Sequence, residues 1–219
     1  MLWYENELEL LQATMLVYND TIPKKLDAVY LFGHTPENEI AILEHGATLV
    51  REGRTSRLLL CGGGRYFPSG DEVTCAYSGG ISWKKQLISH GVPDEKIELL
   101  PRPAGLSHTG TEALQLAFWA IENTHRPGFK LGVVTVTGHL LRAFTNTISV
   151  FGDRPISVYA IPPKPLPWFQ EASWSQGEGG QTRLKSLEGE LDRLNRYYAK
   201  GDIVSAGKVI QYIKKREGW

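Results

Sequence analysis

A histidine and an arginine directly follow a buried apolar run in the stretch VVTVTGHLLRAFTN, over residues 133–146. His139 in the first helical turn meets the positive end of the helix dipole, which disfavours its protonated form, and Arg142 gains nothing there from capping. Because neither residue favours helix stability, we interpret both as ligand groups. The guanidinium would clamp a carboxylate or phosphate, and the neutral imidazole would exchange one proton. The alternative makes Arg142 an ordinary charge on the solvated helix face.

Glycines and small polar residues follow other apolar runs. Gly62, Gly63 and Gly64 leave one run without side chains, which opens backbone N–H groups to an anion. A tight turn that needs positive φ is the alternative. The sequence has neither a P-loop ending in Lys-Ser/Thr nor a GxGxxG fingerprint, so neither standard nucleotide motif is met. Further candidate ligand contacts are Gly33, Ser107, Thr109, Glu112, Thr135 and Thr137.

The stretch LSHTGTE, over residues 106–112, has the pattern of a helix start. Thr109 and Glu112 have the spacing of a capping box. Capping does not explain Ser107 and His108, and a helix start with spare hydroxyls is also where an anionic group binds. A serine hydrolase is disfavoured because the stretch lacks the final glycine of the G-x-S-x-G elbow.

Three of the six histidines, His34, His108 and His139, lie in three of these loops and are the candidate proton-transfer residues. Together with Asp71 or Glu72 they would also offer ligands to a metal ion. Each histidine comes from a separate loop, however, and no two of them have i, i+4 spacing. We therefore predict no metal site.

These residues form one site only if the fold gathers their loops. Short apolar runs alternate with segments of helical period, which is typical of β-α units and a parallel sheet. Loops after parallel strands gather along one edge, where ligands bind. We predict a three-layer Rossmann-like α/β fold with a five-stranded parallel sheet. The predicted strands are Ala28–Phe32, Arg57–Cys61, Ile97–Leu100, Leu131–Val136 and Ile156–Ile161.

Apolar residues at helical spacing predict the helices that cover this sheet. Those expected to share a core-facing stripe are Ile40, Leu43, Ala47 and Val50; Trp83, Leu87 and Ile88; Ala113, Leu116, Ala117, Ala120 and Ile121; and Ala143, Thr147 and Val150. We also predict a helix before the sheet, around Leu8, Leu11 and Met15.

The chain is predicted to be one domain, 1–219, with its core at 27–161. Residues 162–182 are too rich in proline and glycine for regular structure, and we expect Trp168, Phe169 and Trp174 to cover the ends of the strands as a lid. Helices at 183–219 would follow. There Leu184, Leu187, Leu191 and Leu194 predict a core-facing stripe, with a dimer seam, and hence a homo-oligomer, as the alternative.

Composition narrows the class of partner. Twenty-four basic residues balance twenty-four acidic ones, so net charge does not favour nucleic acid or an anionic membrane, and a small-molecule ligand is expected. Two cysteines, Cys61 and Cys75, are too few for a disulfide framework and fit a reducing compartment. With neither a signal peptide nor an apolar run long enough to cross a bilayer, the sequence predicts a cytoplasmic protein.

Several motifs resemble the SanA/YdcF/ElyC-like family, long catalogued as a domain of unknown function. The resemblance covers about residues 27–161, and VTVTGHLLRA is its most specific part, similar to the family's Val-Thr-Ser-x-x-His-x-x-Arg-Ala. LLLCGGG is similar to the family's strand ending in Ser-Gly-Gly, HGVPDEKIELL to its Gly-Val-Pro turn, and SHTGTEA to its Asn-Thr-x-Glu-Asn segment. The chain departs from that pattern at Cys61, in the serine's place, and at Glu112, displaced by one position.

The resemblance implies a Rossmann-like sheet with its site over the glycine-rich loop. It implies S-adenosylmethionine as the leading named ligand, because some members bind it, while others are tied to envelope or lipid-carrier maintenance. Those envelope members carry an N-terminal membrane anchor that this sequence lacks, so the resemblance favours the soluble YdcF-like branch.

Three functions remain open on the sequence. The first is a protein that binds an anionic, nucleotide-like small molecule and acts on it, with Arg142 on the anion and His139, His34 or His108 transferring protons. The second is a hydrolase or transferase of phosphate or peptide-like esters. The third is a noncatalytic binding module whose aromatic segment, residues 168–174, contacts a partner.

Overall fold

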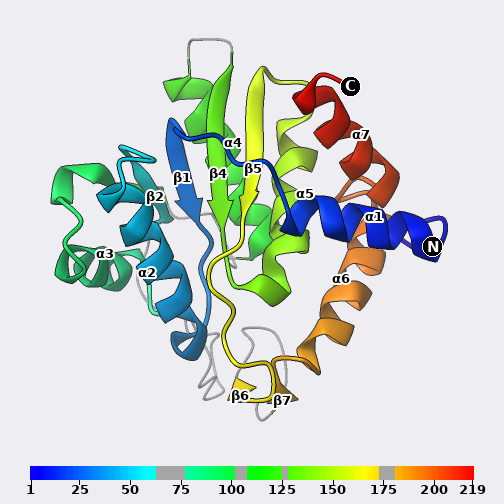
Figure 1. Ribbon diagram of the computed structural model, residues 1–219, viewed down its shortest axis with the longest axis horizontal. Helices are drawn as coiled ribbons and strands as arrows, with labels where there is room; N and C mark the ends of the chain where they lie inside the picture. The colour runs from blue at the N-terminus through cyan, green and yellow to red at the C-terminus, as the bar shows by residue number, and fades with distance from the viewer. Residues whose placement is uncertain (63–76, 102–107, 125–127, 173–180) are drawn as a thin grey trace.

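A parallel sheet of five strands lies at the centre of the described part of the computed structural model, in the order β3-β2-β1-β4-β5 (Figure 1). The structure describes residues 1–62, 77–101, 108–124, 128–172 and 181–219. The predicted α/β class and parallel sheet are therefore confirmed. The strands are β1 Ala28–Leu31, β2 Leu58–Cys61, β3 Ile97–Leu100, β4 Phe129–Val134 and β5 Ile156–Ile161.

The strand order reverses beside β1. The chain first builds outward from β1 through β2 to β3, then returns to the other side of β1 with β4 and β5. β1 and β4 are thus parallel neighbours whose following loops diverge, and ligands bind in the crevice at such a switch point. His34 follows β1 and His139 follows β4, so the topology places both beside that crevice.

Helices cover both faces of the sheet and give the three predicted layers (Figure 1). α2 (Pro36–Arg51) and α3 (Gly80–Ser89) pack on one face, while α4 (Thr109–Asn123) and α5 (Leu140–Phe151) pack on the other. α1 (Glu7–Tyr18), α6 (Ser186–Lys200) and α7 (Ala206–Glu217) extend this second layer. The shorter elements are 3-10 turns at Asp94–Lys96 and Thr137–His139 and an antiparallel pair, β6 (Glu171–Ala172) and β7 (Gln181–Thr182).

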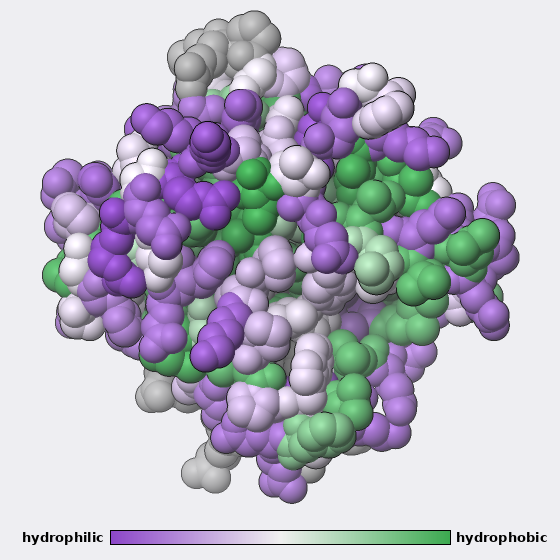
Figure 2. All heavy atoms as spheres, viewed as in Figure 1, coloured by the Kyte–Doolittle hydropathy of each residue, from purple (hydrophilic) through white to green (hydrophobic). Residues whose placement is uncertain are grey.

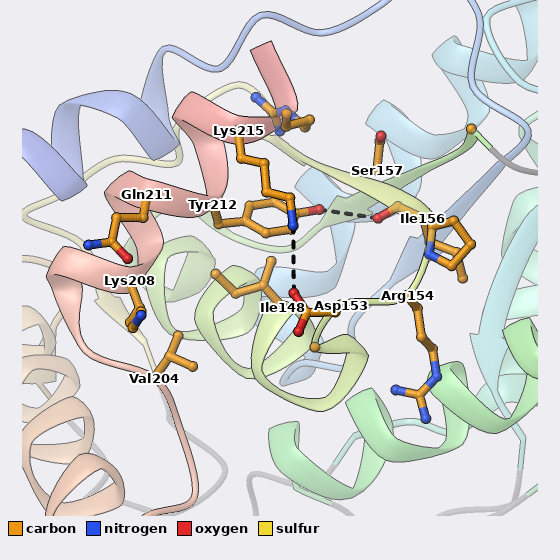
Figure 3. A pocket seen from close by; sticks show the side chains of 14 residues that line it. Ile148, Asp153, Arg154, Ile156, Ser157, Val204, Lys208, Gln211, Tyr212 and Lys215 are labelled. Atoms are coloured by element: carbon orange, nitrogen blue, oxygen red, sulfur yellow. Dashed lines mark hydrogen bonds and ion pairs between the residues drawn. The ribbon is translucent and has the colours of Figure 1, made fainter. Parts of the chain in front are cut away.

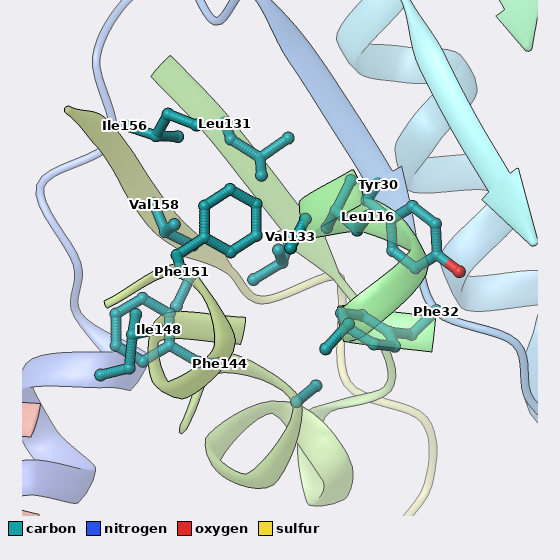
Figure 4. Close-up of a cluster of buried hydrophobic side chains, with 14 of the residues drawn as sticks. Tyr30, Phe32, Leu116, Leu131, Val133, Phe144, Ile148, Phe151, Ile156 and Val158 are labelled. Atoms are coloured by element: carbon teal, nitrogen blue, oxygen red, sulfur yellow. The ribbon is translucent and has the colours of Figure 1, made fainter. Parts of the chain in front are cut away.

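Side chains that point to the two faces of the sheet form two separate apolar cores. Along β1, Tyr30 faces the core under α4 and α5, whereas Val29 and Leu31 face the core under α2 and α3. Figure 4 shows the first core, in which the rings of Phe144 and Phe151 from α5 pack over the sheet. Burial on both faces explains why the strands read as continuous apolar runs rather than as alternating ones.

The predicted helices exist, but several of their predicted core faces are wrong. Ile40, Ile88 and Ile121 at the margins of their stripes are 40%, 43% and 50% exposed, because each apolar face is narrower than the sequence indicates. Val150 is only partly buried. In the leading helix the buried side chains are Ala13 and Val17. Leu8, Leu11 and Met15, around which this helix was predicted, are exposed, and Figure 2 shows green apolar atoms around α1.

The leucine stripe predicted after residue 183 is also corrected. Of its four leucines only Leu194 is buried, and Leu184 is 45% exposed. The inner face of α6 carries Ser186, Glu190 and Leu194, four residues apart, so two of its three positions are polar. A helix that presents a carboxylate to the interior needs a charged partner there.

Candidate functional site

The structure brings Arg142, His139 and Thr109 into contact with one another at the C-terminal edge of the sheet. The first turn of α5 supplies Arg142, the preceding 3-10 turn supplies His139, and the first turn of α4 supplies Thr109. Helices α4 and α5 pack side by side, which aligns their N-terminal ends beside the strand ends. Residues predicted from two separate loops are therefore in contact with one another.

A carboxylate from the C-terminal helix occupies the fork of Arg142. Arg142 Nε donates to Glu190 Oε2 at 2.6 Å and Nη2 donates to Oε1 at 3.1 Å, which is the bidentate arrangement of a guanidinium and a carboxylate. Arg193 Nη1 adds a second cation at 3.0 Å from Oε1. Arg142 and Glu190 are 6% and 5% exposed, so the interpretation of Arg142 as a surface charge is wrong.

The hydrogen bonds of Arg142 also fix the tautomer of His139. Arg142 Nη2 lies 2.7 Å from His139 Nδ1, and because arginine only donates, Nδ1 must accept. The imidazole proton is then on Nε2, which donates to Thr109 Oγ1 at 3.1 Å. Arg142 Nη1 donates to the same hydroxyl at 2.8 Å. Thr109 Oγ1 thus receives two hydrogen bonds, and its own proton is available for donation.

The charge states follow from burial and from Arg142. Burial and the Arg142 guanidinium lower the pKa of His139, so the imidazole is neutral at pH 7, as predicted. Burial, and not the helix dipole expected from the sequence, is the leading cause of the lowered His139 pKa. Burial alone would raise the pKa of the Glu190 carboxyl, but Arg142 outweighs it and holds that pKa well below its usual range. The described cluster therefore holds two guanidiniums and one carboxylate around a neutral histidine.

His34 lies beside His139, with their rings edge to face and centroids 5.8 Å apart. His34 Nδ1 accepts the backbone N–H of Thr35 at 2.9 Å, which leaves the proton on Nε2. Burial, reinforced by His139, lowers the pKa of His34 to about 3. Both histidines are thus neutral and carry their protons on Nε2.

The start of α4 differs from the predicted capping box. His108 is the N-cap, its Nδ1 accepts the N–H of Thr111, and Thr111 Oγ1 accepts the N–H of His108. The box is therefore shifted by one residue relative to Thr109 and Glu112. His108 therefore caps α4 through its Nδ1, and burial and Arg142 lower the pKa of its imidazole.

Glu112 takes no part in the His108–Thr111 capping box, and its side chain lies at the end of β1. It is 6% exposed and its Oε2 accepts the Tyr30 hydroxyl at 2.9 Å and the Gly33 N–H at 3.0 Å. Burial raises the pKa of Glu112 to about 7, although both hydrogen bonds oppose the rise. This carboxyl is a described group beside the site whose charge changes near neutral pH.

Two hydroxyls at the end of β4 lack partners in the part of the chain that the structure describes. Thr135 Oγ1 and Thr137 Oγ1 are both buried without a hydrogen bond. A buried hydroxyl without a hydrogen bond is costly, so each is a candidate contact for a polar group. Both residues were predicted as ligand contacts, and they lie within four residues of His139.

Of the three aromatic residues predicted to form a lid, only Trp168 is described near the end of β4. Trp168 and Leu166 border a small cavity of about 20 Å³ at the end of β4, together with Thr137 and Arg183. Arg183 attaches this segment to α2, since its Nε donates to Asn38 Oδ1 at 2.8 Å. Phe169 is 81% exposed and does not cover the strand ends. Trp174 lies outside the described residues.

Only Gly62 of the three glycines in the glycine-rich loop belongs to the described residues. Gly62 is buried directly after β2, while Gly63, Gly64 and Ser107 lie outside the described residues, as do Asp71 and Glu72. Gly33 is packed against the ring of Tyr77, so that a Cβ there would lie 3.1 Å from Tyr77 Cδ2. Among the residues that the structure describes, no three His, Cys, Asp or Glu side chains are placed to hold a metal ion.

Sequence reasoning missed Glu190, Arg193 and Glu39. Glu39 is a further buried carboxyl group, in the first turn of α2, and accepts hydrogen bonds from Ser78, Trp83 and Gln86. The available signal for Glu190 was its spacing of four from Leu194, which puts both on the inner face of α6. Its partner lies 48 residues away in the sequence, and no local pattern indicates that pairing.

A wider groove, of about 700 Å³, lies at the other end of the sheet, where β5 begins beside α7 (Figure 3). Figure 3 shows Lys208, Gln211 and Lys215 along α7, with Tyr212 reaching Ile156. Lys215 pairs with Asp153 at 3.7 Å, and both side chains are highly exposed. The predicted site residues do not line this groove, so its volume does not identify it as the reactive site.

The comparisons with known proteins identify no family for this chain. No family model matches the sequence, and a search of curated proteins finds no match. Within the described residues, no helix combines the length and apolar character needed to cross a bilayer.

Proposed function

We propose that this chain binds an anionic, nucleotide-like small molecule at the crevice between the ends of β1 and β4. The observation that carries the proposal is the buried fork of Arg142, which already holds a carboxylate with bidentate geometry. A buried guanidinium surrounded by further donors is a suitable seat for a ligand carboxylate or phosphate. The strand order, which reverses at this crevice, supports the same location.

The resemblance to the SanA/YdcF/ElyC-like family supports S-adenosylmethionine as the first ligand to test. That molecule is a net cation through its ammonium and sulfonium groups, but it carries a carboxylate for the Arg142 fork and a nucleoside for contact with the unpartnered hydroxyls of Thr135 and Thr137. The two cysteines of the chain, too few for a disulfide framework, support a cytoplasmic location as part of this proposal.

A hydrolase or transferase is the second candidate, because three side chains have the separations of a nucleophile, base and acid. His139 Nε2 lies 3.1 Å from Thr109 Oγ1, and His139 Nδ1 lies 3.4 Å from Glu190 Oε2. In a working triad, however, Nδ1 carries the proton and Nε2 accepts one from the hydroxyl. Arg142 reverses both roles here, so the arrangement as it stands favours binding over nucleophilic catalysis.

Small molecules released on denaturation would test the binding proposal. We expect mass spectrometry of the supernatant to recover S-adenosylmethionine, or another carboxylate or phosphate compound, from the purified parent. Much less should be recovered from Arg142→Lys, because an ammonium cannot reproduce the planar fork. Arg154→Lys, at an exposed arginine, is the matched control. Equal recovery from all three proteins, or no recovery and no calorimetric binding of S-adenosylmethionine, would refute the proposal.

A further inference from the structure

We infer that Glu190 is a built-in substitute for the ligand, so that a carboxylate-bearing ligand binds by displacing it from the Arg142 fork. The inference rests on the proposed function and adds to it the class of the anionic group and the group with which it competes. A carboxylate is favoured because the seat already holds one on both Nε and Nη2 of Arg142. These two donors lie in one plane and match two oxygens of a planar anion.

The charges of the seat favour an added anion. Arg142 and Arg193 bring two positive charges to a single carboxylate, and the lowered pKa of His139 keeps its imidazole neutral. The centroid of the Tyr197 ring lies 6.0 Å from Arg142 Cζ, with the guanidinium over the ring. When Glu190 leaves, two guanidiniums remain buried without a counter-ion, which is unfavourable unless another anion takes the place. Displacement is therefore an exchange of one carboxylate for another.

The unpartnered hydroxyls give independent support for a missing molecule. Thr135 directly follows β4 and Thr137 begins the 3-10 turn after it, both separate from α6, and neither hydroxyl has a partner among the described residues. A ligand held only as Glu190 is held would leave both hydroxyls unsatisfied. A ligand larger than the Glu190 carboxyl, which extends from the fork towards the end of β4, would satisfy them.

Glu190→Ala with added acetate tests the seat without knowledge of the natural ligand. The substitution empties the fork and should lower the melting temperature. Acetate should then restore about 3–6 °C at 100 mM, the rise expected for a dissociation constant near 10 mM. Sodium chloride at equal ionic strength should not. The parent protein should not respond to acetate, nor should Glu188→Ala, which removes an exposed carboxylate of the same helix.

Two further variants keep the inference falsifiable. Glu190→Ala/Arg142→Met should lose the acetate response, because the fork is gone. Glu190→Gln, which keeps the shape of the side chain but not its charge, should bind S-adenosylmethionine at least about tenfold more tightly than the parent in calorimetry. No acetate response in Glu190→Ala, or unchanged affinity in Glu190→Gln, would show that Glu190 is only a structural ion-pair partner.

These outcomes separate the inference from the proposed function. An acetate response in a protein that neither carries nor binds a nucleotide-like molecule would retain the seat and reject S-adenosylmethionine. Binding of S-adenosylmethionine that depends on Arg142, with no acetate response and no effect of Glu190→Gln, would retain the function and reject displacement.

Discussion

We compare the unfolding free energy of Glu112→Gln with that of the parent. The difference, variant minus parent, should be larger at pH 8 than at pH 5. Burial raises the pKa of Glu112 from 4.5 to about 7, so the folded state binds its proton more tightly than the unfolded state does. This stabilisation is complete below the unfolded pKa and is lost as the pH rises through the folded pKa. Glutamine keeps the neutral form at every pH and avoids the loss.

The size of the effect follows from the two pKa values. A pKa raised from 4.5 to about 7 corresponds to roughly 3 kcal/mol in total, most of which is lost between pH 5 and pH 8. The free energy of Glu112→Gln unfolding minus that of the parent should therefore rise by roughly 2–3 kcal/mol over this range. Urea unfolding followed by tryptophan fluorescence measures both values.

The histidines do not obscure this difference. Burial lowers the pKa of His34 to about 3, so His34 destabilises the folded state as the pH falls below its usual value of 6.5, the opposite direction to Glu112. Because both proteins retain His34, its contribution cancels in the difference. Glu122→Gln removes an exposed carboxylate of the same helix and is the matched control. A difference for Glu112→Gln that is constant with pH would refute the assignment of a raised pKa.

Three other substitutions test the packing around the sheet. Arg142→Ala should cost about 3–5 kcal/mol in urea unfolding because it leaves a carboxylate buried opposite it, and a cost below about 1 kcal/mol would contradict the buried ion pair. Tyr212→Phe removes the hydroxyl bonded to the Val158 N–H at 2.7 Å on the outer edge of β5, so we expect a loss of about 1 kcal/mol and faster hydrogen exchange at that amide; unchanged exchange would contradict this. Gly80→Ala should destabilise the protein by about 1–3 kcal/mol, because its Cβ would lie 2.3 Å from a backbone oxygen at the end of β2. In the control Gly189→Ala the Cβ meets only a flexible side chain at 3.3 Å, so this substitution should stabilise α6. Equal effects of the two substitutions would refute the steric argument.

The strands could be predicted because burial on two faces leaves a strong local pattern. Ile97–Leu100 and Ile156–Ile161 match the observed β3 and β5 end to end. The predicted strand Leu131–Val136 is shifted, since β4 covers Phe129–Val134. Its last two residues are apolar or β-branched like a strand, but they lead into the 3-10 turn that carries His139, and turn geometry there outweighs β propensity.

The gathering of Thr109, His139 and Arg142 could also be predicted, since it depends only on parallel strands placing their loops at one edge. The partner of Arg142 could not. A sequence shows which helix face is apolar, and α6 was assigned the wrong face because its leucines outnumber Ser186 and Glu190. The choice between the two faces is made by the fork of Arg142, a tertiary contact that outweighs the periodicity of the helix.

Arg142 joins the two candidate functions through a single proton. While its Nη2 donates to His139 Nδ1, the imidazole proton must remain on Nε2, and Thr109 cannot give its proton to the histidine. A ligand that drew Nη1 and Nη2 of Arg142 onto its own anion would release both Nδ1 and the threonine hydroxyl. The imidazole proton is then free to move to Nδ1, which leaves Nε2 to accept the threonine proton. Binding through Arg142 is thus the step that any catalytic use of Thr109 would require first, and for that reason the binding proposal takes precedence over the catalytic one.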